Sequence, residues 1–153
     1  MTWYETFLWL HISATALWVG GDAMIQAFAY RILRSRDAER IAGFSRDVEW
    51  IGLRVLMPSS LVLILSAVAL MINGNWDWSE PFVSVGLAVW IVSFLVGAGF
   101  LVPESGRIAK VIDEQGAGSP DAQRRIRRIL LYSRLELVLL LVVVFMMVVK
   151  LGT

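Results

Sequence analysis

The sequence predicts an all-α integral membrane protein: a four-helix bundle that runs up-down-up-down, with both termini outside. Of its 153 residues, 58% are hydrophobic and only 18% are charged, which is too apolar for a soluble domain of this length. The apolar residues form four runs of spanning length, at about 3–30, 50–72, 82–102 and 129–149. None alternates as a strand would, and in lipid only helices or closed barrels satisfy every backbone group. We therefore expect one transmembrane domain.

Composition also excludes several classes of function. The net charge is +1, which favours neither a nucleic acid nor an acidic partner. The chain has no cysteine, so disulfides, iron–sulfur clusters, cysteine-ligated zinc and covalently attached haem are excluded. We find no phosphate loop, H-E-x-x-H motif or nucleophile elbow. The lipid bilayer is the partner that composition predicts, while a homo-oligomer or a membrane-complex partner is left open.

The first run, residues 3–30, carries one polar stripe. At helical spacing the stripe consists of His11, Thr15, Trp18, Asp22 and Gln26. Hydrocarbon penalises an imidazole or a carboxylate by several kcal/mol unless another group satisfies it, on the order of 2.5–3.5 kcal/mol for a charge at the centre of a span. The stripe is therefore expected to face other protein, a bound group or water.

The connections between the runs set the orientation. The basic residues gather in the first and third connections: Arg31, Arg34, Arg36, Arg40, Arg46, Arg107, Lys110, Arg124, Arg125, Arg127 and Arg128. The turn NGNWDWSEP between the second and third runs has no Lys or Arg. By the positive-inside rule, the basic connections face the cytoplasm of a bacterial inner membrane. Trp3, Tyr4, Trp76 and Trp78 would form the outer aromatic belt.

Three local features follow along the chain. The first connection has the charge mix of an interfacial helix, with Ile41 and Phe44 on its less polar side. Pro58 is expected to kink the second run and free a backbone carbonyl. The fourth helix is expected to start at Pro120, with Ser119 as its N-cap.

Four charged residues lie inside the predicted spans at similar depth. Counting from the cytoplasmic edge places Asp22, Arg54, Arg134 and Glu136 roughly 8–13 Å deep. Their charges cancel, as a buried network requires. The preferred pairing joins Arg54 to Asp22 or Glu136, while Arg134 reaches the headgroups. The network is interpreted as a structural lock or as a site for an anionic group.

His11 is the only histidine and lies about 12 Å below the opposite, outer edge. Such an imidazole can bind haem iron or copper, relay a proton, or hydrogen-bond to a neighbouring helix. Met71, Met146 and Met147 fall in the same half, and thioether sulfur is a soft ligand. His11 with Met71 or Met147 would therefore suit haem b or Cu(I), although methionines are more often core filler.

Several motifs resemble a bacterial family of four-span membrane proteins of unknown function. The motifs are LHISATALWVGG at the first run, RVLMP at 54–58 and MVVK at 147–150. That family looks distantly allied to the copper-resistance D proteins and to HemJ-type protoporphyrinogen oxidases. The resemblance implies a plasma-membrane bundle and, through HemJ, a haem-associated oxidation, with His11 matching the first-span histidine. The tyrosine–histidine pair of HemJ relatives is replaced here by VWIVSFLVGAG.

Three functional hypotheses follow. The first is a haem- or porphyrin-linked redox protein with His11 as the ligand. The second is a copper-handling protein that uses His11 with the outer methionines. The third is a non-catalytic subunit or scaffold of a membrane complex, in which the buried charges only fix the bundle.

Overall fold

The computed structural model describes residues 2–149 as an assembly of helices. The elements are α1 (Trp3–Ser35), α2 (Ala38–Ile51), η1 (Gly52–Leu56), α3 (Met57–Gly74), α4 (Pro81–Val96), η2 (Gly97–Leu101), α5 (Val102–Gln115) and α6 (Pro120–Val149). Within the described part all regular structure is helical, which confirms the predicted all-α fold. Lys150, which closes the MVVK motif, and the C-terminus lie outside the described residues.

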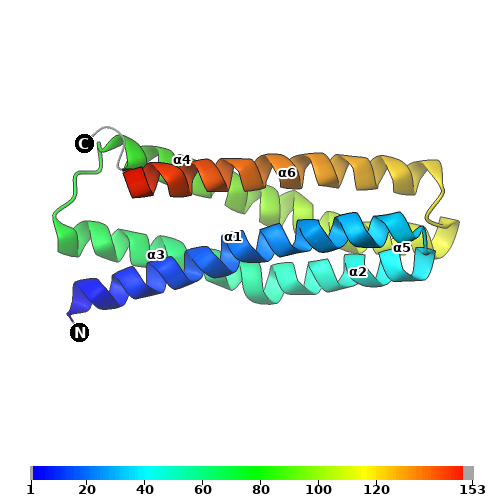
Figure 1. Ribbon diagram of the computed structural model, residues 1–153, viewed down its shortest axis with the longest axis horizontal. Coiled ribbons are helices and arrows are strands. Elements are labelled where there is room, and N and C mark those ends of the chain that lie inside the picture. Colours follow the sequence, from blue (N-terminus) through cyan, green and yellow to red (C-terminus); the bar gives the residue numbers. More distant parts are fainter. Residues whose placement is uncertain (1, 150–153) are drawn as a thin grey trace.

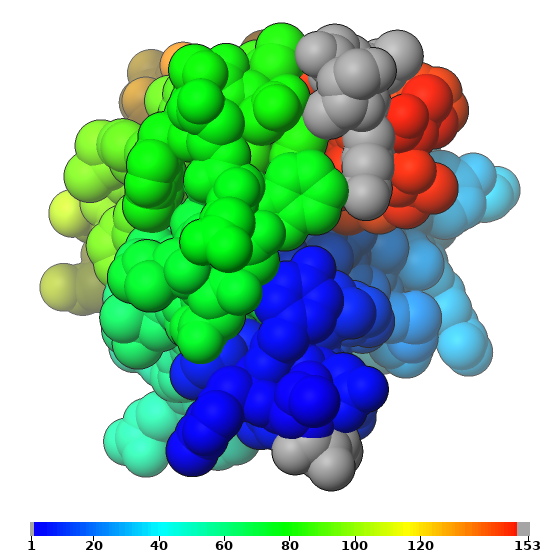
Figure 2. Space-filling model, turned by 90° about the vertical axis from the view of Figure 1, so that its left-hand side faces the viewer, coloured from blue at the N-terminus to red at the C-terminus, as the bar shows by residue number. Residues whose placement is uncertain are grey.

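Elements α2, η1 and α3 join end to end into one long helix, and α4, η2 and α5 form another. Successive long helices run antiparallel (Figure 1). The start of α1, the 75–80 turn and the end of α6 lie together at what we call the aromatic end. Figure 2 looks onto this end, with α1 in blue, the turn in green and α6 in red. The opposite end, which holds the 36–37 and 116–119 connections, is called the basic end.

Three of the long helices are long and apolar enough to cross a membrane: Ala38–Gly74, Pro81–Gln115 and Pro120–Val149. Large apolar side chains on them point outward, including Leu65, Leu95 and Val138, as contact with lipid requires. The α1 helix is as long, but its polar stripe lowers its hydropathy. That α1 is a fourth span, and that the termini lie outside, stay predictions.

At the basic end the helices form a small hydrophobic core of their own. Its buried members come from α2, α5 and α6: Ile41, Ala42, Ile108, Ala109, Ile112, Ala122 and Ile126. The prediction of an interfacial helix in the first connection was therefore wrong. The apolar face that contains Ile41 packs against α5 instead of lying on the membrane, and α2 continues directly into α3. The start of α6 at Pro120 is confirmed, because Ser119 Oγ accepts a hydrogen bond of 3.2 Å from the Ala122 amide.

Two π-bulges interrupt the long helices just before a proline. Proline has no N–H, so it cannot bond the carbonyl one turn earlier, and the helix widens locally. The bulge Gly52–Leu56 precedes Pro58, where the sequence predicts a kink, and Gly97–Leu101 precedes Pro103. The kink itself stays a prediction. Both segments read G-x-x-x-L-x-P, so the same device occurs in the two antiparallel helices.

The two bulges pack against each other reciprocally. A Cβ added at Gly52 would lie 2.5 Å from Val102 Cγ2, and one added at Gly97 would lie 3.5 Å from Met57 Cε. Val102 and Met57 each precede a proline. The residue before each proline therefore rests on the first glycine of the opposite bulge. Glycine at position 52 is required by this close approach.

Candidate functional site

Two partly open cavities lie along the described part of the bundle. The first, which we call the aromatic cavity, has a volume of about 390 Å³ and lies at the aromatic end. Its wall is largely aromatic and aliphatic, and includes Tyr4, His11, Met71, Trp76, Trp78, Phe82, Trp90 and Met147. A concave, apolar site with a few placed polar groups is the usual form of a small-molecule pocket, of about 300–1,000 Å³.

His11 is the principal polar group of this cavity, and its surroundings fix its tautomer. Its Nδ1 lies 3.2 Å from the Leu63 carbonyl and 3.4 Å from Ser66 Oγ. The Ser66 hydroxyl donates its own hydrogen to the Leu63 carbonyl at 2.9 Å, so both neighbours of Nδ1 act as acceptors. Nδ1 therefore carries the hydrogen, and Nε2 keeps a free lone pair. Residues 2–149 provide no hydrogen-bond partner for Nε2.

The structure brings the sequence-predicted cofactor residues together. His11 from α1, Met71 from α3 and Met147 from α6 line the same cavity. Gly86 on α4 faces Met147, and a Cβ at that position would lie 2.9 Å from the methionine Cε. Whether these residues bind a cofactor stays a prediction. Within the described residues, no three His, Asp and Glu side chains gather as a metal site.

The second cavity, which we call the acidic cavity, lies between α1, α3, α4 and α6 and extends into the basic end. Its volume is about 120 Å³, and its wall is mainly apolar. Asp22 and Glu136 are its two ionisable residues, each only 8% exposed. Asp22 Oδ2 and Ser93 Oγ are buried without a hydrogen-bond partner in the described part of the chain.

The predicted pairing of Arg54 with Asp22 or Glu136 is not present. Arg54 and Arg134 are both exposed, and neither joins an ion pair within residues 2–149. A long guanidinium side chain near the edge of a span reaches water more readily than it enters a dry interior. The exposure of Arg134 agrees with its expected reach toward the headgroups. Among the described residues, no basic side chain lines this cavity, so an anionic group bound there would have no positive charge to pair with.

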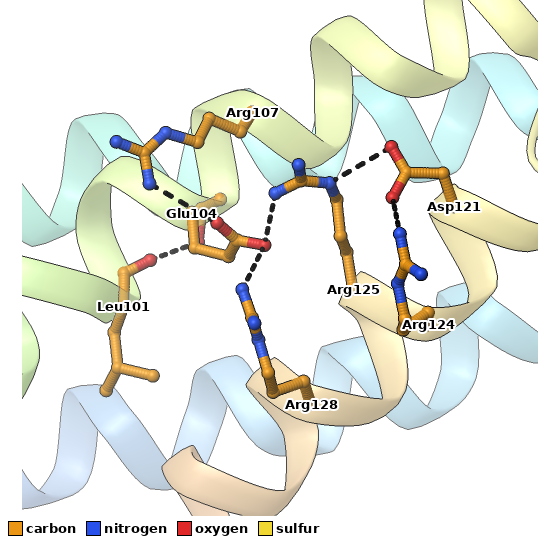
Figure 3. A network of polar contacts seen from close by, with 8 residues as sticks. Leu101, Glu104, Arg107, Asp121, Arg124, Arg125 and Arg128 are labelled. Atoms are coloured by element: carbon orange, nitrogen blue, oxygen red, sulfur yellow. Dashed lines mark hydrogen bonds and ion pairs between the residues drawn. The ribbon is translucent and has the colours of Figure 1, made fainter.

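A different charge cluster, which sequence reasoning missed, occupies the basic end (Figure 3). Glu104 on α5 is fully buried, and its carboxylate lies 2.8 Å from Arg125, 3.3 Å from Arg128 and 3.5 Å from Arg107. Arg125 also lies 3.3 Å from Asp121. The hydrogen bonds to Glu104 and Asp121 raise the pKa of Arg125. The sequence signal for this cluster was Glu104 directly after Pro103, together with the basic run RRIRR at 124–128.

Asp121 completes this cluster at the start of α6. Its carboxylate accepts hydrogen bonds of 2.7 Å from Arg124 and 3.3 Å from Arg125. These bonds, the one from Arg124 foremost, lower the pKa of Asp121. Four arginines surround the two carboxylates of this cluster, and their ion pairs fasten α5 to α6, so its geometry is that of a structural tie.

A family model described as "Predicted integral membrane protein (DUF2269)" covers residues 5–151, which is nearly the whole chain. No curated protein matches the chain, and no solved structure does either. The predicted likeness to copper-resistance D and HemJ-type proteins therefore stays a prediction.

Proposed function

The chain belongs to the DUF2269 family of predicted integral membrane proteins, and we propose that it binds a flat, apolar cofactor of the haem or porphyrin class in the aromatic cavity. The observation that carries this proposal is the state of His11. Its Nδ1–H is held by the Leu63 carbonyl, and its Nε2 lone pair is left free in an aromatic wall. Metal-binding histidines use this arrangement, in which a backbone carbonyl fixes the ring and raises its basicity.

The residues present fit such a group. His11 would bind the iron, and Met71 or Met147 would supply a thioether on the same wall. The indole and phenol rings of Trp76, Trp90 and Tyr4 would provide an apolar aromatic wall for such a group. When bound, haem would supply one-electron transfer. The protein's part is to hold the ring, exclude water and set the polarity around it.

A visible absorption spectrum of the detergent-purified protein tests this proposal. We expect a Soret band that is absent from His11→Ala and retained in Thr15→Ala, whose hydroxyl bonds the His11 carbonyl at 2.7 Å without lining the cavity. Ser66→Ala should keep the band and shift it, because it removes one acceptor from Nδ1. A colourless preparation that also fails to bind added haem or protoporphyrin would reject the proposal.

Copper is a second candidate, favoured by the convergence of His11, Met71 and Met147 on one cavity. A soft imidazole–thioether set suits Cu(I). Elemental analysis after copper-replete growth should then find copper in the wild type and little in Met71→Leu or Met147→Leu. The same two variants would keep a haem band if His11 alone carries the haem. A preparation that lacks both copper and haem would favour the role of a non-catalytic subunit or scaffold.

We further propose that α1 is the fourth span and that the basic end faces the cytoplasm of a bacterial inner membrane. The exposed apolar residues Trp9, Leu17 and Met24 on α1 support the span, and the gathered arginines support the orientation. Reporters inserted after Gly116 and after Asn75 test it. A reporter after Gly116 that is shielded from cytosolic labelling would contradict the orientation.

A further inference from the structure

The acidic cavity holds two carboxyl groups for which residues 2–149 provide no basic partner. Asp22 projects from α1 and Glu136 from α6, and both line the same space. The wall contributed by α3, α4 and α5 carries serines but no ionisable residue. The nearest bases along the chain, Arg54 and Arg134, are exposed outside it. Among the described residues, every ionisable group that lines the cavity is therefore an acid.

Two ionised carboxylates in this position would be unstable. Transfer of each ion from water into a protein interior costs on the order of several kcal/mol, even after the protein relaxes around it. Their mutual repulsion adds to that cost, and one carboxyl of such a pair normally keeps its proton. A single bound proton removes most of both terms. The protonated carboxyl then becomes a hydrogen-bond donor, able to bond a water in the cavity.

The wall of the cavity also contains buried polar atoms without a hydrogen-bond partner in the described part of the chain. Asp22 Oδ2 and Ser93 Oγ are both more than nine-tenths buried and have no partner in the described part of the chain. A space of about 120 Å³ holds several waters, since one water needs roughly 10–15 Å³ of such volume. Water bridging Asp22, Ser93 and Glu136 would satisfy these atoms.

We propose that Asp22 and Glu136 form an intramembrane proton-binding site, in which the pair holds one shared proton at neutral pH and exchanges it with water through the acidic cavity. The wall extends past Ser105 and Ser45 into the basic end, which gives the direction of exchange. Toward the aromatic end, the Trp90 indole donates a hydrogen bond of 3.0 Å to the Ser60 carbonyl, joining the walls of the two cavities. The proton enters from water and returns to water, so no other reactant is needed.

Infrared spectroscopy of the purified full chain tests the proposal. A protonated carboxyl absorbs as a C=O stretch well separated from that of a carboxylate, and the exposed acids are ionised at pH 7. We expect a protonated-carboxyl band at pH 7 that disappears in Asp22→Asn/Glu136→Gln. The matched control is Glu104→Gln, which should leave the band unchanged because Glu104 lies outside the acidic cavity and pairs with three arginines.

Exchange is tested by titrating the wild type, which needs no variant. The band should fade reversibly when the pH is raised to strongly alkaline values, and should shift in D₂O as the shared hydrogen is replaced. Absence of the band at pH 7, or its persistence in the double variant, would overturn the proposal. Loss of the band in Na⁺ buffer but not in choline buffer at equal pH would also overturn it, since sodium would then be the occupant.

Discussion

Glu104 and the Asp22–Glu136 pair are almost equally buried, yet their surroundings differ in charge. Glu104 is fully enclosed and lies within 3.5 Å of three arginines. Asp22 and Glu136 are each 8% exposed and have no cation in the wall around them. A buried carboxylate beside arginines has its counter-ions within the protein, whereas a pair without such neighbours needs a proton, an ion or water. Burial alone therefore does not distinguish a structural tie from a working site; the presence of neighbouring cations does.

The largest expected loss of stability comes from removing Glu104 from its cluster of arginines. Glu104→Ala leaves Arg107, Arg125 and Arg128 gathered without their common counter-ion, and should lower the free energy of unfolding by about 3–5 kcal/mol. Thermal or denaturant unfolding of the detergent-purified protein measures this. Asp113→Ala is the control, because its ion pair with Arg46 is more than half exposed on both sides and should be worth at most about 1 kcal/mol. Equal losses in the two variants would contradict the structural role of Glu104.

The second largest effect is expected from the packing at Gly52, between the acidic cavity and Glu104. Gly52 lines the acidic cavity and supports Val102, which lies two residues before Glu104. Gly52→Ala places a methyl group into the Val102 side chain and should cost about 1–3 kcal/mol. Gly20→Ala is the matched control on α1, where a Cβ meets nothing within 4 Å. That substitution should be neutral or stabilising by up to about 1 kcal/mol, through helix propensity.

Neutralising Asp22 and Glu136 should change the free energy of unfolding less than the loss of Glu104 does, and should not lower it substantially. Asp22→Asn/Glu136→Gln removes both ionisable groups while keeping their shape, so the free energy of unfolding should stay within about 1 kcal/mol of the wild type or rise. Glu104→Gln, the same chemical change within the cluster of arginines, should be destabilising. Parallel unfolding curves decide between them. If the double variant lost as much stability as Glu104→Ala, Asp22 and Glu136 would be a lock after all.

Much of this architecture could be predicted from the sequence, because the length and spacing of apolar residues along the chain indicate which segments can cross a membrane. Four apolar runs, the polar stripe on α1 and the cap at Ser119 each depend on local spacing. The stripe indeed faces the interior, where His11 contacts the Leu63 carbonyl and Gln26 Nε2 donates to the Ser133 carbonyl at 2.7 Å.

The wrong predictions concern contacts that depend on helix rotation. Pairing Arg54 with Asp22 followed from equal depth and opposite charge, but depth does not specify which way a side chain points. The π-bulge at Gly52–Leu56 inserts an extra residue into the turn that contains Arg54, and this shift in helical phase is invisible to a 3.6-residue count. Glu104 was missed because the length of the predicted third span stopped at residue 102, although the helix continues to Gln115.

The smallest expected effect sharpens the comparison through pH. The pKa of Asp121 is lowered by hydrogen bonds from Arg124 and Arg125, so its stabilising contribution is present above the pKa of the unfolded chain, about 3.9. That contribution is lost as the pH falls through the folded-state value. Asp121→Asn should therefore be slightly less stable than the wild type at pH 7, and the two curves should converge below about pH 4. Asp77→Asn removes the carboxylate that Ser79 holds at the aromatic end, which lies far from any arginine cluster. If the curves of Asp77→Asn and the wild type also converge below about pH 4, hydrogen bonds alone are enough to make a carboxylate stabilising. If a salt-sensitive difference in stability is found only for Asp121→Asn, the arginines cause the effect.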